Sequence, residues 1–112
     1  MLTIYHNPRC SKSRQTLQII EDANAQVEIV QYLKTPLTEG ELRDLANKLG
    51  VSAIDMMRTK EDEFKAQNLK GADDDTLFAA MAATPKLMER PIVVSGNSAV
   101  IGRPPENVNT LL

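Results

Sequence analysis

Apolar residues are spaced in two different ways along the first third of the chain. The run Leu2–Tyr5 is short, rich in β-branched and aromatic residues and followed by an Asn-Pro pair, which is typical of a buried strand that ends in a turn. From Ser11 the apolar positions recur every three or four residues without Gly or Pro, which predicts a helix. Val27–Leu33 again has the composition of a strand. This order favours a βαβ unit with parallel strands.

The segment from about residue 38 to 89 has the spacing of a helical block. Thr38 and Glu41 form a capping-box sequence, and the apolar stripe that follows stops at Gly50, so a helix is expected between them. Further N-caps are expected at Ser52, at Thr59 and at Asp73 or Asp74. Helical spacing predicts that the methionines of the block fill its core: Met56, Met57, Met81 and Met88.

Strand patterns return after Pro91. Ile92–Val94 and Ala99–Ile101 are apolar runs separated by a segment that contains Gly96 and Asn97, which predicts a hairpin. The apolar residues near the end of the chain predict a closing helix: Val108, Leu111 and Leu112. The complete order is βαβ, helices and ββα, which makes the chain an α/β protein.

Length and charge restrict the classes of protein that remain. With 112 residues, the chain is expected to be a single domain, 1–112, in which the helical block is an insertion. Thirteen Lys and Arg residues against fifteen Asp and Glu give a net charge of -2, which provides no general attraction for nucleic acid or an anionic membrane. No apolar run approaches the ~20 residues of a membrane span, and the first ten residues show no basic segment followed by an apolar signal core. We therefore expect no nucleic-acid partner and no membrane partner.

The chain has one cysteine and one histidine. A single cysteine cannot form an internal disulfide, which favours a reducing compartment and hence a cytoplasmic location. A single histidine leaves no His pair for zinc or iron, so we expect no metal site.

Cys10 is the main candidate for chemistry because it lies between the first predicted strand and the first turn of the predicted helix. Backbone N–H groups at a helix start stabilise a thiolate, and Arg9, Lys12 and Arg14 add positive charge. Both effects lower the pKa of a thiol, and the thiolate is the nucleophilic form. The alternative is that Cys10 is a small buried apolar residue, as most lone cysteines are.

Ser13 and His6 are candidate supporting residues. The hydroxyl of Ser13 is expected on the same side of the first helical turn as Cys10, where it could donate a hydrogen bond to the sulfur. The alternative is an ordinary first-turn serine. His6 either tunes the thiol or transfers a proton, or it is a hydrogen-bonded structural residue.

The segment His6–Leu17 resembles the active-site loop of the glutaredoxin-type arsenate reductases, in which the catalytic cysteine follows a His-Asn-Pro turn. Three later segments resemble the remaining motifs of that family, in the same order and at suitable spacing: Arg58–Glu61, Glu89–Val94 and Gly102–Glu106. The resemblance covers essentially the whole chain.

The resemblance implies a thioredoxin-like fold, with the N-terminal βαβ and C-terminal ββα segments around a mixed four-stranded sheet. It also implies that Cys10 attacks arsenate, and that an arginine clamp holds the oxyanion: Arg58, Arg90 and Arg103. Guanidinium groups suit this task because they are permanently charged and offer paired donors. The Arg90-Pro91 peptide bond is expected to be cis and to lie beside Cys10. The supporting residues would be His6, Ser13, Arg14 and Pro91.

By family analogy, the protein is an enzyme of arsenical resistance that binds no cofactor. Since there is no second cysteine, the Cys10 adduct must be released by external thiols, namely glutathione as co-substrate followed by glutaredoxin. Two alternatives remain open. One is a monothiol glutathione-linked oxidoreductase with another substrate. The other is an RNA-polymerase-binding regulator of the same fold.

Overall fold

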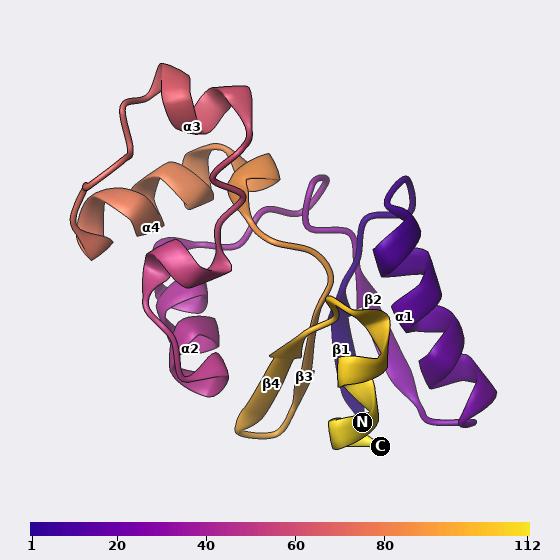
Figure 1. Cartoon of the computed structure of the whole chain (residues 1–112). Coiled ribbons are helices and arrows are strands. Elements are labelled where there is room, and N and C mark those ends of the chain that lie inside the picture. The colour runs from indigo at the N-terminus through magenta and orange to yellow at the C-terminus, as the bar shows by residue number, and fades with distance from the viewer. The chain divides into compact units, whose positions relative to one another are not determined.

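The computed structural model describes residues 1–112 and divides into two compact units (Figure 1). Unit 1 consists of Met1–Thr35 together with Arg90–Leu112, and unit 2 consists of Pro36–Glu89. Each unit is described by itself.

Unit 1 is built on a four-stranded sheet with the strand order β2-β1-β3-β4. The strands are β1 (Leu2–Tyr5), β2 (Val27–Val30), β3 (Ile92–Ser95) and β4 (Ser98–Ile101). β1 pairs in parallel with β2 and antiparallel with β3, and β3 and β4 form an antiparallel hairpin. The predicted mixed sheet is therefore confirmed. The hairpin turns at Gly96, whose φ of 59° lies in the left-handed region that glycine adopts without strain.

Two helices of unit 1 pack on one face of this sheet. They are α1 (Ser11–Asp22) and the 3-10 helix η3 (Pro105–Leu111), which lie side by side in Figure 1. β1 alternates, so that its first and third residues point to the buried face. The core between sheet and helices consists of Leu2, Ile4, Ile20, Val93 and Val108.

Two expectations about unit 1 were wrong at element ends. β2 stops at Val30, because the Gln31 carbonyl accepts hydrogen bonds from the N–H groups of Lys34 and Thr35 and turns the chain away from the sheet. The side chain of Leu33 is consequently exposed. The closing helix is a 3-10 helix, and Leu112 lies beyond its end with its side chain exposed.

Unit 2 is helical, as the spacing predicts. Its elements are α2 (Glu39–Leu49), η1 (Ala53–Met56), α3 (Asp62–Ala66), α4 (Asp74–Ala83) and η2 (Pro85–Leu87). The capping box of α2 is confirmed. The Thr38 hydroxyl accepts a hydrogen bond from the Glu41 N–H, and the Glu41 carboxylate accepts one from the Thr38 N–H. The helix ends at Gly50, as predicted.

The other predicted caps of unit 2 had mixed outcomes. Asp73 caps α4 by accepting a hydrogen bond from the Thr76 N–H at 2.9 Å. Ser52 is the residue that precedes η1, but its hydroxyl donates to the Asp55 carboxylate instead of capping the backbone. Thr59 is not an N-cap, because a turn closed by the Glu61 N–H and the Arg58 carbonyl precedes α3. The predicted core role of the methionines is confirmed, since the following are all buried: Met56, Met57, Met81 and Met88.

Candidate functional site

The loop between β1 and α1 places Cys10 at the N-cap position of α1, as the sequence predicts. The Cys10 N–H donates to the Asn7 carbonyl at 3.0 Å, which closes a turn. The Cys10 carbonyl accepts a hydrogen bond from the Arg14 N–H at 3.0 Å and begins the helical ladder. The side chain of Cys10 therefore lies at the start of a 12-residue helix, where backbone N–H groups have no helical partner.

The environment of Cys10 lowers the pKa of its thiol. Burial of the sulfur is the largest single effect and acts to raise the pKa. The backbone N–H groups of Ser13 and Lys12 and the guanidinium of Arg90 outweigh it, so that the pKa lies below its ordinary value. The predicted direction is confirmed. The predicted source of charge is wrong, because the cation that acts on the thiol is Arg90 and not the sequence neighbours Arg9, Lys12 or Arg14.

Ser13 and His6 are joined directly. The Ser13 Oγ lies 2.6 Å from the His6 Nδ1 and accepts a hydrogen bond from the Asn7 N–H at 3.0 Å. The Ser13 hydroxyl therefore bridges the ring of His6 and the backbone of Asn7. The hydroxyl is thus used within the loop. The expected hydrogen bond from Ser13 to the Cys10 sulfur is not formed. Both side chains are buried, and their contact fixes the loop to the first turn of α1.

His6 and Arg14 support the loop in different ways. Burial and the nearby Arg14 charge lower the pKa of His6, against a smaller opposing effect of Glu21. A lowered pKa favours the neutral ring. The Arg14 Nη1 donates to the Pro8 carbonyl at 3.0 Å and so closes the loop from its exposed side.

A second set of contacts joins α1 to the segments around β3 and β4. The Arg90-Pro91 peptide bond is cis, which confirms the expectation, and the Arg103-Pro104 bond is also cis. The Gly102 N–H donates to the Pro91 carbonyl at 2.9 Å. A Cβ on Gly102 would lie only 2.5 Å from the Thr16 Oγ1 and 2.8 Å from the Pro91 Cγ, so no larger residue fits without a shift. No local sequence pattern marks Thr16 and Gly102 as neighbours, because their contact joins distant segments.

The three predicted clamp arginines differ in their surroundings. Arg90 is partly buried, and its Nε and Nη1 are buried without a hydrogen-bond partner. Arg103 belongs to the same unit, follows Gly102 directly and is exposed. Arg58 belongs to unit 2, where its guanidinium pairs with the carboxylates of Glu61 and Glu89. Arg58 therefore already has carboxylate partners within unit 2, and its place in a clamp stays a prediction.

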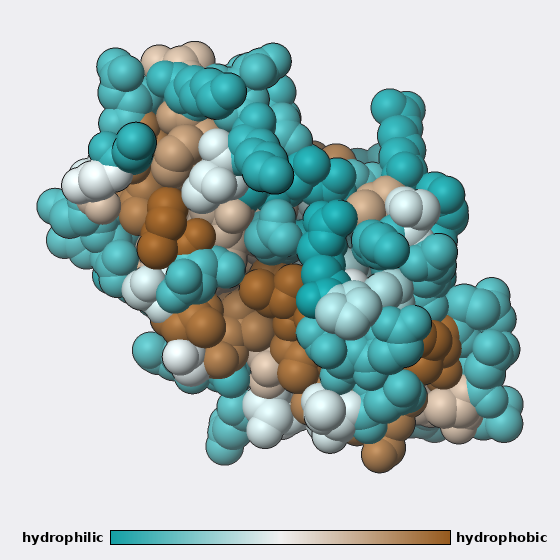
Figure 2. All heavy atoms as spheres, in the orientation of Figure 1, coloured by the Kyte–Doolittle hydropathy of each residue, from teal (hydrophilic) through white to brown (hydrophobic).

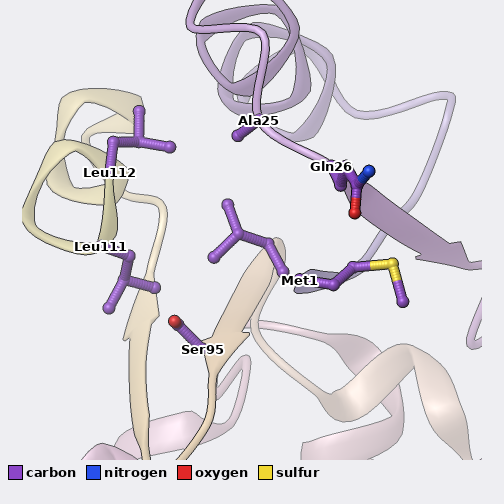
Figure 3. A pocket seen from close by; sticks show the side chains of 7 residues that line it. Met1, Ala25, Gln26, Ser95, Leu111 and Leu112 are labelled. Carbon is purple, nitrogen blue, oxygen red and sulfur yellow. The ribbon is translucent and has the colours of Figure 1, made fainter.

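One hollow of unit 1 lies at the end of the sheet away from Cys10. It has a volume of about 370 Å³, and Figure 3 shows the side chains of Met1, Leu111, Leu112, Ser95 and Gln26 around it. Met1 precedes β1, whereas Cys10 follows the other end of that strand, so the hollow is at the opposite edge of the sheet. Its lining contains no nucleophilic thiol and no charged side chain.

No group of three or more His, Cys, Asp or Glu side chains is placed to hold a metal ion. None of the helices combines the length and the apolar character needed to cross a bilayer. In Figure 2 the surface around the loop that precedes α1, at the upper right, is largely hydrophilic.

Comparisons with known proteins find relatives along nearly the whole chain. A family model described as the ArsC family matches residues 5–111. The YfgD protein of Escherichia coli (strain K12) is 52% identical over 108 residues, which are 94% of this chain and 91% of that protein. An arsenate reductase of Neisseria meningitidis serogroup A is 46% identical over 114 residues, and the match covers 99% of this chain and 97% of that protein. Among solved structures, an arsenate reductase from Vibrio cholerae has a TM-score of 0.96 at 47% identity. The match covers 99% of this chain and 97% of that chain.

Proposed function

Because the chain belongs to the ArsC family and has its thioredoxin-like fold, we propose that it is an arsenate reductase in which the Cys10 thiolate attacks arsenate. The names of its relatives in Neisseria meningitidis and Vibrio cholerae support this substrate. One structural observation carries the proposal. The Cys10 thiol has a lowered pKa, and the Arg90 guanidinium beside it has two buried N–H donors without a hydrogen-bond partner.

Arg90 supplies the argument for an oxyanion. A buried charged donor without an acceptor costs free energy, on the order of 1–3 kcal/mol or more. The Nε and Nη1 of Arg90 are in that condition, while the same guanidinium acts on the Cys10 sulfur. A tetrahedral oxyanion at this point would satisfy both donors and bring its central atom close to the nucleophile.

The other two arginines complete the proposed clamp. Arg103 is suited to it because Gly102 packs against Thr16 and Pro91, which holds the start of this segment next to α1 and β3. Arg58 is assigned on the resemblance of its sequence motif. Its carboxylate partners Glu61 and Glu89 would hold its guanidinium in one orientation before substrate binds.

The proposed reaction begins and ends with the free Cys10 thiol. The Cys10 sulfur bonds to arsenic, and one arsenate oxygen leaves as water after protonation. Glutathione then replaces a second oxygen as its sulfur bonds to arsenic, and another water leaves. The thiolate of glutaredoxin attacks the glutathione sulfur and leaves with it as a mixed disulfide. The electron pair of the broken As–S bond stays on arsenic, which is thereby reduced from As(V) to As(III). Water finally releases arsenite and restores the Cys10 thiol.

External thiols are part of the proposal because Cys10 is the only cysteine and is free. No resolving thiol within the chain can release the adduct. The cytoplasm is the proposed location, since a reducing compartment supplies glutathione and glutaredoxin.

The test is a coupled assay of arsenate reduction with glutathione, glutaredoxin and a glutathione-recycling system. The parent protein should turn over arsenate, and Cys10→Ser should lose turnover while it keeps its circular dichroism spectrum. Arg90→Lys keeps the positive charge but loses the paired donors, so its turnover should fall about 10²-fold or more. Lys48→Gln, a charge change in unit 2 that lies on α2, is the matched control and should match the parent. If Cys10→Ser reduced arsenate as fast as the parent protein, the proposal would be refuted.

A further inference from the structure

A smaller hollow of about 210 Å³ lies beside the loop that carries Cys10. Two segments of unit 1 line it, namely residues 6–9, which lead to Cys10, and residues 31–34, which follow β2. Because β1 and β2 are parallel, both segments leave the sheet at the same edge. The His6 N–H donates to the Val30 carbonyl at 2.8 Å and holds the two segments together. The hollow is therefore a feature of the fold and not a gap between mobile loops.

The charges around this hollow have one sign. Arg9 and Lys34 are exposed members of its lining, and neither forms an ion pair. The lining contains no carboxylate. Leu33 and Pro8 add apolar surface to the lining, and Gln31 adds an amide. In a chain with a net charge of -2, this is a local site for an anionic group attached to an apolar stem.

The position and the size of the hollow indicate what kind of ligand it would hold. Arg9 is the residue before Cys10, so their Cα atoms are ~3.8 Å apart. Pockets that enclose a whole small molecule usually have volumes of about 300–1,000 Å³. This hollow is smaller, so it would hold one end of a ligand whose remainder extends outward.

We propose that this hollow binds a carboxylate end of the small peptide thiol that attacks the Cys10 adduct, which is glutathione in the proposed function on which this inference rests. Arg9 and Lys34 attract the carboxylate, and Leu33 contacts the aliphatic part of the peptide. Binding at this point raises the local concentration of the thiol next to Cys10 and orients its sulfur. The hollow thus distinguishes an anionic peptide thiol from a neutral thiol of similar reactivity.

A disulfide-exchange assay tests this without arsenate. Cys10 is first converted to its mixed disulfide with 2-thiopyridine. The thiolate of glutathione then attacks the Cys10 sulfur, the new disulfide joins Cys10 to glutathione, and neutral 2-thiopyridone leaves and is followed by its absorbance. The same rate is measured with glutathione diethyl ester, which has the same thiol but no carboxylate. The measured quantity is the ratio of the two second-order rate constants.

The variants reverse the charges of the hollow. Arg9→Glu and Lys34→Glu should each lower the ratio by about threefold, and the double variant by about tenfold, given the strength of exposed ion pairs. The decrease should shrink at high ionic strength. Lys12→Glu is the matched control, because it reverses an exposed charge beside Cys10 that does not line the hollow, and its ratio should stay within about twofold of the parent. Arg9→Gln and Lys34→Gln give smaller changes in the same direction should a charge reversal prevent folding.

Several results would overturn the inference. One is a ratio that is the same in the parent and the double variant. Another is an equal decrease in Lys12→Glu, which would assign the effect to the general charge around the loop. A third is slowed exchange with reduced glutaredoxin and an unchanged glutathione ratio, which would assign the hollow to a protein partner. The exchange assay contains no arsenate, so its ratios do not depend on whether the protein reduces arsenate. If the parent reduces arsenate but the charge reversals leave the ratio unchanged, only the proposed subsite is refuted and the proposed function stands.

Discussion

Replacing Gly102 with alanine should destabilise the unit that carries Cys10. The new Cβ would lie 2.5 Å from the Thr16 Oγ1 and 2.8 Å from the Pro91 Cγ, both well inside normal contact distance. Neither neighbour can easily move aside. The side chain of Thr16 is completely buried, and its hydroxyl donates to the Lys12 carbonyl at 2.8 Å. The carbon of Pro91 belongs to a closed ring whose residue is also buried.

The expected cost follows from these contacts. Adding about one methyl group at a well-packed position typically lowers the free energy of unfolding by about 1–3 kcal/mol. For a chain of this length, that corresponds to a decrease in Tm of about 4–12 °C. Thermal unfolding followed by circular dichroism measures it. Gly40→Ala is the matched control, because the added Cβ meets only the Thr38 Oγ1 at 3.9 Å and lies in α2, where alanine is favoured by up to about 1 kcal/mol.

A double-mutant cycle identifies the cause of the loss. Thr16→Ala removes both side-chain atoms of Thr16 that face residue 102, so Gly102→Ala should cost less in that background than in the parent. The two substitutions together should be at least about 0.5 kcal/mol more stable than their separate effects predict. A Tm for Gly102→Ala within about 1 °C of the parent would refute the reasoning, and so would strict additivity in the cycle.

Two further predictions concern titration. The pH midpoint for alkylation of Cys10 by iodoacetamide should lie below that of an ordinary cysteine. Arg90→Gln should raise this midpoint, because the Arg90 charge lowers the pKa of the thiol. An equal rise in Lys12→Gln would show that the general charge of the loop is responsible. The pKa of His6 is lowered in the folded protein, so the unfolded chain takes up the proton first and stability should fall as the pH drops below about 6.5 towards the folded pKa. Urea unfolding between pH 5 and 8 measures this slope, which His6→Gln should lack; equal slopes in the two proteins would contradict it.

The fold could be predicted to the extent that local patterns determine it. The short apolar run of β1 and the capping box of α2 are complete within a few residues, and both elements have the predicted starts. The errors occur where a hydrogen bond between nearby residues overrides composition. Leu33 has the composition of a strand residue, but the carbonyl of Gln31 turns the chain before it. Thr59 has the composition of an N-cap, but the preceding turn delays α3.

The same distinction applies to the site. The position of Cys10 at the start of α1 could be predicted, because a strand end and a helix start are both local features. The partner of the Ser13 hydroxyl could not, since the sequence does not show that the ring of His6 folds back to within 2.6 Å of it. Local patterns do not identify the cation beside the sulfur either, because Arg90 is 80 residues from Cys10 and is brought to it by the pairing of β3 with β1. Only the family resemblance implied that Arg90 lies near Cys10.

The donors around Cys10 divide into two groups, and this division fits the proposed chemistry. The backbone N–H groups of Ser13 and Lys12 stabilise the thiolate and belong to α1, so they stay in place when substrate enters. The guanidinium of Arg90 also acts on the sulfur, but its Nε and Nη1 have no partner and are left for a second anion. A thiolate and an arsenate repel each other, and a cation that contacts both reduces that repulsion at the moment of attack. Lysine at position 90 would retain the charge and not the geometry. It should therefore leave the alkylation midpoint of Cys10 closer to that of the parent than Arg90→Gln does, while it removes arsenate turnover.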